Sequence, residues 1–209
     1  ERLTVFYRNK PIDELVFACP ACYNMFAHIL PEQFGAQFAF KMTFFSDWFA
    51  EQRRHGRFPI RTPLREAVVI HDSCHARVLG ATFMDKQREL LRDLGLTVHE
   101  TALNREHGLC CGVAAGCNCY SLYDLFHEGG RALHALDQAQ GDAIAVYCTG
   151  CMLTLDIFRL INPFGKRLVH LIEYVREAMG ETVHRRNAIK ALQMVVGIGM
   201  HALPYYLSR

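Results

Sequence analysis

The sequence lacks strong net charge and the signatures of several common enzyme classes. The 23 Lys and Arg residues against 21 Asp and Glu leave a formal charge of +2 with mixed signs, so no basic stripe indicates a nucleic-acid partner. It has no P-loop, no H-E-x-x-H motif and no Ser–His–Asp order. No signal-peptide pattern follows Glu1, which predicts a reducing compartment, taken as the cytoplasm.

A long uninterrupted apolar run is also missing. Residues 188–207 (AIKALQMVVGIGMHALPYYL) are apolar, but Lys190, His201 and Pro204 interrupt them, so they do not read as a membrane-spanning helix. We expect residues 185–209 to form a tail helix packed on the domain. The alternative is an interfacial helix that docks on a partner, such as a membrane subunit, or lies peripherally on the cytoplasmic membrane.

Cysteine, by contrast, is abundant. The chain has nine cysteines, an odd number that fits poorly with a fully paired disulfide framework and favours thiolates or metal ligands. Five of them recur at near-equal intervals, with 35 residues between the first and second and 36 between the third and fourth. These five are Cys74, Cys110, Cys111, Cys148 and Cys151.

The order of apolar runs and amphipathic stretches predicts an α/β, Rossmann-like fold with a mostly parallel sheet. Cys74 and Cys148 lie at the carboxyl ends of predicted strands, where open α/β sheets bind ligands, and all five sulfurs can converge there. The expected strands are 67–70, 96–99 and 143–147, and the expected helices are 84–94, 121–139 (with a weak point at Gly129-Gly130) and about 152–160.

The chain also contains an internal repeat. LVFACPACYNMF (15–26) parallels IAVYCTGCMLTL (144–155), and both read as a strand, a Cys-x-x-Cys and a helix start. Downstream, 41–56 parallels 166–180, and both are expected to be amphipathic helices ended by glycine. We therefore interpret 1–60 as the closing half of a first, truncated copy, 57–64 as a linker and 65–180 as a complete second copy. The chain would then be a fragment, a split gene product or a lineage that lost its first half.

The number of thiols favours a cluster over a single ion. Zinc is satisfied by four ligands, whereas five thiols are present, and the adjacent Cys110 and Cys111 suit a larger group in which each sulfur reaches a different iron. A zinc site, a vicinal disulfide and a set of buried free thiols stay open as alternatives.

The pattern C-x35-CCG-x36-C-x-x-C resembles the cysteine-rich CCG domain of heterodisulfide reductases, of the iron–sulfur subunits of glycolate and lactate oxidases, and of anaerobic glycerol-3-phosphate dehydrogenase. Members usually carry two such domains in tandem. The resemblance implies that Cys74, Cys110, Cys111, Cys148 and Cys151 bind a [4Fe-4S] cluster, in some members non-cubane. It further implies that Cys19 and Cys22 are a degenerate first site that could hold zinc.

The resemblance implies an iron–sulfur subunit of a multi-subunit oxidoreductase, heterodisulfide-reductase-like, that exchanges electrons with a disulfide, a thiol or a quinone-linked partner. One alternative is an electron-transfer subunit of a flavin-dependent 2-hydroxy-acid or glycerol-3-phosphate dehydrogenase. Another is a zinc-stabilised interaction module without redox function. Expected partners are a flavoprotein and a ferredoxin-type iron–sulfur subunit, because the chain has no C-x-x-C-x-x-C run of its own.

Three histidines lie close to the cysteines in sequence. His71 and His75 flank Cys74, and His107 precedes the cysteine pair, so each is a candidate to deliver a proton or tune a cluster. An ordinary hydrogen-bonded or solvent-facing loop histidine is the commoner role. Cys117 and Cys119 follow the CCG motif and are interpreted as structural thiols, with a substrate-facing or redox-relay role as the alternative.

Overall fold

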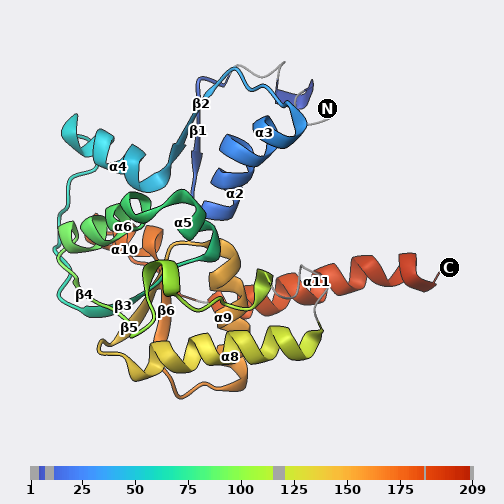
Figure 1. Cartoon of the computed structure of the whole chain (residues 1–209). Coiled ribbons are helices and arrows are strands. Elements are labelled where there is room, and N and C mark those ends of the chain that lie inside the picture. The colour runs from blue at the N-terminus through green and yellow to red at the C-terminus, as the bar shows by residue number, and fades with distance from the viewer. Residues whose placement is uncertain (1–4, 8–11, 115–120, 186, 208–209) are drawn as a thin grey trace.

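The computed structural model describes residues 5–7, 12–114, 121–185 and 187–207, and Cys117 and Cys119 lie outside these ranges. The chain has the predicted α/β fold, with two parallel sheets and helices packed around them (Figure 1). The larger sheet has four strands in the order β4-β3-β5-β6. They are β3 (Ala67–His71), β4 (Thr97–His99), β5 (Ala143–Val146) and β6 (Arg167–His170).

The strand order places a switch point at the centre of this sheet. The chain leaves β3 to form β4 on one side and then returns to form β5 on the other side of β3, with every pair parallel. The connections that start from β3 and β5 therefore diverge at the carboxyl ends of these strands. In open α/β sheets this crevice is where ligands bind.

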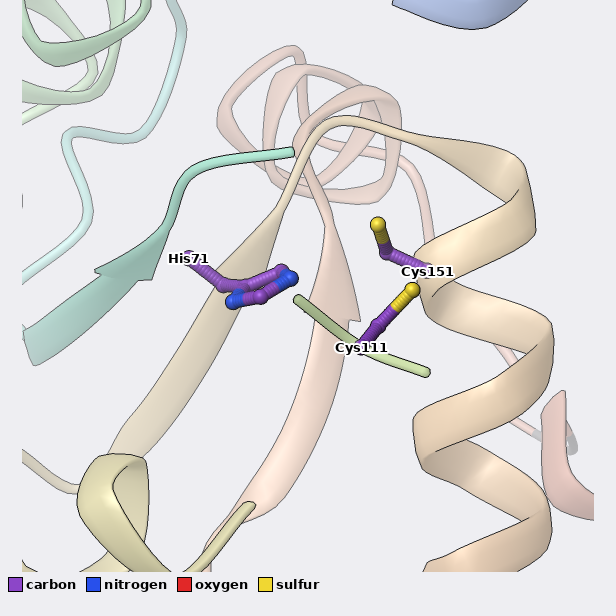
Figure 2. Close-up of side chains that lie close together, drawn as sticks. All are labelled: His71, Cys111 and Cys151. Carbon is purple, nitrogen blue, oxygen red and sulfur yellow. The ribbon is translucent and has the colours of Figure 1, made fainter. Parts of the chain in front are cut away.

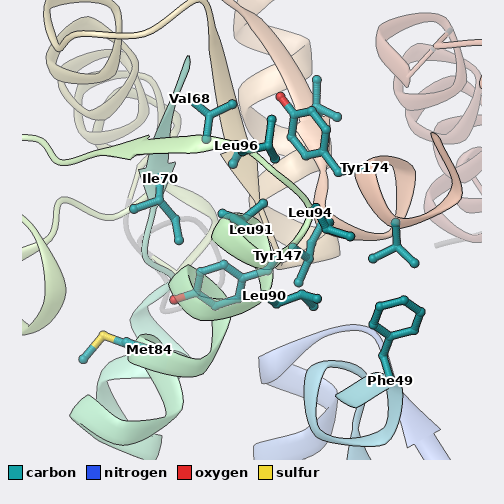
Figure 3. Packing of buried hydrophobic residues seen from close by; sticks show 14 of the residues in the cluster. Phe49, Val68, Ile70, Met84, Leu90, Leu91, Leu94, Leu96, Tyr147 and Tyr174 are labelled. Carbon is teal, nitrogen blue, oxygen red and sulfur yellow. The ribbon is translucent and has the colours of Figure 1, made fainter. Parts of the chain in front are cut away.

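Helices cover both faces of the four-stranded sheet because its strands are apolar on both sides. Val68 and Ile70 point to one face, where they pack with α6 (Ala81–Asp93) and α10 (Leu171–Ala178), as Figure 3 shows. Val69 and Val146 point to the other, packing with α8 (Leu122–Gln138) and α9 (Thr149–Ile161). This alternation decides which residues after each strand face which helices.

The amino-terminal part has its own small sheet, in which β1 pairs parallel with β2. Its order of strand, Cys-x-x-Cys, helix, strand and helix is the same as that of β5, α9, β6 and α10. Its elements are β1 (Glu14–Phe17), α2 (Pro20–Asn24), the π-helical turn Met25–Ile29, α3 (Leu30–Phe34), β2 (Lys41–Phe44) and α4 (Phe45–Arg54).

The prediction that 41–56 and 166–180 are helical throughout is wrong at their beginnings. Each segment opens with a strand, β2 and β6, and becomes helical only from Phe45 and Leu171. The reason is tertiary: the first apolar residues of each segment complete a parallel ladder, with β1 and with β5, which overrides their fit to a helical period. Both helices end before a glycine with positive φ, Gly56 and Gly180, as expected.

The remaining predicted elements are confirmed with shifted ends. Helix α6 begins at Ala81, and α9 begins at Thr149, directly after Cys148. Helix α8 begins after Ser121, whose side chain forms a capping box with Asp124, and it continues through Gly129-Gly130 without a break. The short helices between these elements are α5 (Cys74–Leu79) and the 3-10 turn Arg105–His107.

The tail forms helix α11 (Asn187–Leu207), which packs on α9 and then extends away from the domain (Figure 1). This agrees with the expected terminal helix. Ala191 is buried in the contact, whereas Leu192, Met194 and Met200 are exposed. Within the part of the chain that the structure describes, we find no helix with the length and apolarity needed to cross a membrane.

A buried carboxylate on α9 predicts pH-dependent stability. Asp156 is 5% exposed, and its Oδ2 has no hydrogen-bond partner among the described residues. Burial, with a smaller contribution from Glu173, raises the pKa of Asp156 to about 7 against the opposing effect of Arg159. The folded state therefore holds this proton more tightly than the unfolded chain, and stability should fall as the pH rises from about 4 to about 7.

Asp156→Asn should remove the loss of stability that ionisation of the buried carboxyl causes at high pH. We expect the variant to gain about 2 kcal/mol in free energy of unfolding over the parent at pH 8, and much less at pH 4.5. Urea unfolding of both proteins at the two pH values measures the difference. An equal difference at both pH values would contradict the assignment.

Candidate functional site

Three segments bring five cysteines to the carboxyl edge of the four-stranded sheet. Cys74 is the first residue of α5, after β3. Cys148 caps the start of α9, after β5, and Cys151 lies in the first turn of that helix. Cys110 and Cys111 follow the 3-10 turn in the loop after β4. The sequence-based prediction that these segments converge is confirmed.

The five sulfurs form a continuous row. The Cys74 thiol interacts with Cys110, Cys110 with Cys111, Cys111 with Cys151, and Cys151 with Cys148. Cys111 and Cys151 are 1% exposed and Cys148 is 5% exposed, whereas Cys74 and Cys110 are partly accessible. The row therefore runs from a solvent-accessible end into the protein.

His71 is the one candidate histidine that lies inside the row. One ring nitrogen and the sulfurs of Cys111 and Cys151 all lie within 4.8 Å of one another, and Figure 2 shows the imidazole facing these two sulfurs beside α9. The side chain is 5% exposed, and its Nε2 has no hydrogen-bond partner within the described ranges. Burial lowers the pKa of His71, which keeps the ring neutral. A neutral imidazole can either ligate a metal or donate one N–H to a sulfur.

The other two histidines are placed differently. His75 lies on α5, where its Nδ1 is 3.3 Å from the Asn24 side chain. His107 is largely exposed beside Glu106 on the 3-10 turn. Of the three candidates, the structure brings His71 into contact with the thiols.

The donor set fits an iron–sulfur group. The thiol of Cys151, followed by that of Cys19, lowers the pKa of Cys148 to about 2, while the neighbouring Cys110 raises the pKa of Cys111 to about 12. Cys110 also has a lowered pKa, because the Cys111 and Cys74 thiols and the backbone N–H of Gly112 stabilise its charge. The two thiols with lowered pKa values, Cys110 and Cys148, are thus separated along the row by Cys111 and Cys151, whose pKa values are raised, since buried like charges repel. A cationic centre would let all five ionise, as metal-bound thiols do.

The loop of the cysteine pair is shaped around this group. Gly112 has φ of +93°, and its N–H lies 3.4 Å from the Cys110 sulfur. A β-carbon there would lie 2.5 Å from the carbonyl oxygen of Leu125 on α8. Glycine is therefore required both by the turn and by the close approach of the helix.

A buried ionic network on the opposite face ties the three cysteine segments together. We call Asp72, Arg88, Glu100, Arg105 and Tyr147 the Asp72 network. Arg88 donates to both oxygens of Asp72 at 3.0 and 2.6 Å and also pairs with Glu100. The Tyr147 hydroxyl donates to Asp72 at 2.6 Å, and the backbone N–H of Arg105 does so at 3.0 Å.

The network positions the site because its members neighbour the ligand candidates. Asp72 lies two residues before Cys74, Tyr147 directly precedes Cys148, and Arg105 begins the turn that leads to Cys110. Sequence reasoning missed it. One signal existed: Arg88 falls on the apolar stripe of its helix, four residues after Met84 and three before Leu91, where a charge needs a buried partner.

A family model described as a cysteine-rich domain, CCG, matches residues 68–156, a range that contains all five cysteines. This part of the chain is similar to a cysteine-rich CCG domain. The chain is also similar to the "Probable iron-sulfur-binding oxidoreductase FadF" of Bacillus subtilis (strain 168), with 27% identity over 148 residues. That alignment covers 69% of this chain and 20% of the relative, so the chain spans about a fifth of the relative's length.

The two cysteines of the amino-terminal repeat differ in exposure. Cys19 is buried, and its Sγ lies 3.7 Å from the Sγ of Cys148. Cys22 is exposed. The predicted first site, in which both would hold zinc, stays a prediction.

Proposed function

We propose that this chain is an iron–sulfur subunit of an oxidoreductase and that Cys74, Cys110, Cys111, Cys148 and Cys151 hold its cluster. The observation that supports this most is the unbroken row of five sulfurs from three segments at the switch point of the sheet. The cysteine-rich CCG match and the iron–sulfur-binding relative support the same class of function. Such a cluster accepts and donates single electrons when bound.

The protein's own residues would supply binding, orientation and exclusion of water. The buried Cys111, Cys148 and Cys151 would hold the inner side of the cluster. Cys74 and Cys110 would hold the accessible side, where an electron partner or a sulfur substrate can approach. His71 would direct its unpaired nitrogen at the inner sulfurs and so set their hydrogen bonding.

We propose a [4Fe-4S] cluster and a heterodisulfide-reductase-like role, with a flavoprotein and a ferredoxin-type iron–sulfur partner. The adjacent cysteine pair and the fifth thiol favour a multi-iron group over a single tetrahedral zinc. The accessible end of the row, formed by Cys74 and Cys110, favours exchange with a partner at that edge. An electron-transfer subunit beside a flavin-dependent dehydrogenase would use the same site without substrate chemistry of its own.

Replacing a cysteine of the row should remove the cluster. The full chain would be purified without oxygen, and its iron, acid-labile sulfide and zinc measured per chain together with the EPR spectrum. We expect about four irons per chain in the parent, and a loss of at least roughly 80% of this iron in Cys110→Ser and Cys111→Ser. Cys22→Ser is the matched control, because Cys22 is exposed, and it should retain the parent's iron.

Zinc without iron, even after anaerobic reconstitution with ferrous iron and sulfide, would overturn the proposal. Iron that Cys111→Ser retains in full would overturn the ligand assignment. A redox titration of the cluster-loaded parent, with and without a dithiol–disulfide couple, would then show whether the cluster reacts with thiols or only carries electrons.

A further inference from the structure

Cys19 lies at the cluster site of the second repeat, although it belongs to the first. Its Sγ is 3.7 Å from the Sγ of Cys148, which follows it by 129 residues. Each residue lies two positions after the end of a parallel strand, β1 or β5, and is the N-cap of the helix that follows, α2 or α9. The two Cys-x-x-Cys segments therefore meet through their first cysteines, and Cys19 continues the row of sulfurs beyond Cys148.

The separation of these two sulfurs is that expected for ligands of one metal ion. Thiolate sulfurs about 2.3 Å from a tetrahedral ion are about 3.8 Å apart along each edge of the tetrahedron. Cys19 is also buried, with 6% of its surface exposed. Its repeat partner Cys22, three residues later, is exposed, so only Cys19 is both buried and at ligand spacing from the row.

Packing holds Cys19 in this position. Helix α2 packs on α5, the helix that begins with Cys74. The Asn24 side chain on α2 contacts His75 at 3.3 Å, and the ring of Tyr23 stacks on Phe83 with their centroids 6.3 Å apart. The first repeat thus contacts the segments of both Cys74 and Cys148.

We propose that Cys19 is a sixth sulfur ligand of the cluster, supplied by the first repeat. This rests on the proposed function, since it needs the cluster that the five other cysteines hold. The amino-terminal part would then have a specific role, because it closes the buried end of the site. A separate zinc site at Cys19 and Cys22 would no longer be needed.

The test compares Cys19→Ala with Cys22→Ala in the full chain, each reconstituted without oxygen with ferrous iron and sulfide. The readouts are the EPR g-values and the half-time of iron loss to a ferrous chelator. We expect Cys22→Ala to match the parent, and Cys19→Ala to show shifted g-values and at least fivefold faster loss of iron. A loaded Cys19→Ala with the parent's g-values and half-time would overturn the role of Cys19 and leave the cluster intact. A parent that takes up no iron would instead overturn the proposed function.

A second measurement needs only the unaltered protein and so does not depend on how a variant folds. After the iron is chelated, diamide should oxidise the two thiols, forming the Cys19–Cys148 disulfide with loss of two protons and two electrons to the diamide. Mass spectrometry would detect the linked peptides. We expect the link in the stripped protein and at least tenfold less of it in the loaded protein. Equal linkage in both, or none in the stripped protein, would overturn the proposal.

Discussion

Arg88→Met is expected to lower the free energy of unfolding by about 3–5 kcal/mol, because it leaves the buried Asp72 carboxylate without its counter-ion. Arg88 is fully buried and donates to both carboxylate oxygens. The Tyr147 hydroxyl and the Arg105 N–H would remain as donors, but neither has a charge to offset that of Asp72. Urea unfolding of parent and variant measures the difference.

Arg53→Met is the matched control, since it removes the same cation from the exposed Arg53–Asp93 pair, which also involves α6. It should cost less than about 1 kcal/mol. Adding Asp72→Asn to Arg88→Met should recover part of the loss, because the double variant no longer buries an unpaired charge. If Arg88→Met and Arg53→Met cost the same, the Asp72 network does not contribute in this way.

The effect of Arg88→Met should also depend on pH. Burial raises the pKa of Asp72, but the hydrogen bonds and charge of Arg88 more than offset this and bring the pKa below its ordinary value of about 3.9. A lowered carboxyl pKa adds stability above the pKa of the unfolded chain, and this stability is lost as the pH falls through the folded-state pKa. The difference between parent and variant should therefore shrink below about pH 4.

Much of the fold could be predicted from the sequence because local patterns and tertiary structure agree. The β-branched run at 67–70 and the apolar stripe of 84–94 both correspond to the observed elements. Residues 41–44 and 167–170 resemble helix in the sequence because their apolar residues continue smoothly into a true helix. These residues form strands because they pair with β1 and β5, and the local spacing of apolar residues in the sequence contains no information about that pairing.

The parts of the site whose positions follow from the ends of the strands could be predicted from the sequence. Cys74 and Cys148 follow strands that are neighbours in a parallel sheet, so their convergence follows from topology. The alternation of side chains then sends Tyr147 toward α6 and Cys148 toward the thiols, which separates the ionic network from the sulfurs. The approach of Cys19 to Cys148 and the pairing of Arg88 with Asp72 join segments far apart in the chain, and no spacing in the sequence encodes them.

Gly129→Ala is expected to destabilise the protein by about 2–3 kcal/mol and to disturb the cluster site, because there is no room for a β-carbon. A β-carbon at this position would overlap the buried ring of Phe158 on α9 and lie 2.7 Å from the carbonyl oxygen of Cys111. The ring could relieve its overlap only by repacking. The carbonyl oxygen could move only together with the cysteine backbone, so helix α8 would be pushed away from the Cys110–Cys111 loop.

Gly130→Ala is the control, one residue further along the same helix. Gly130 is exposed and has nothing within 4 Å of an added β-carbon, so alanine there should raise stability by up to about 1 kcal/mol through helix propensity. Urea unfolding should show a lower free energy of unfolding for Gly129→Ala and a higher one for Gly130→Ala. Iron release to a chelator should be faster than in the parent for Gly129→Ala alone. If both substitutions stabilise the protein, the pair is only a weak point in a helix, as the sequence suggests. If they differ in sign, Gly129 is the residue that lets α8 approach the cysteine loop closely enough to form the floor of the site.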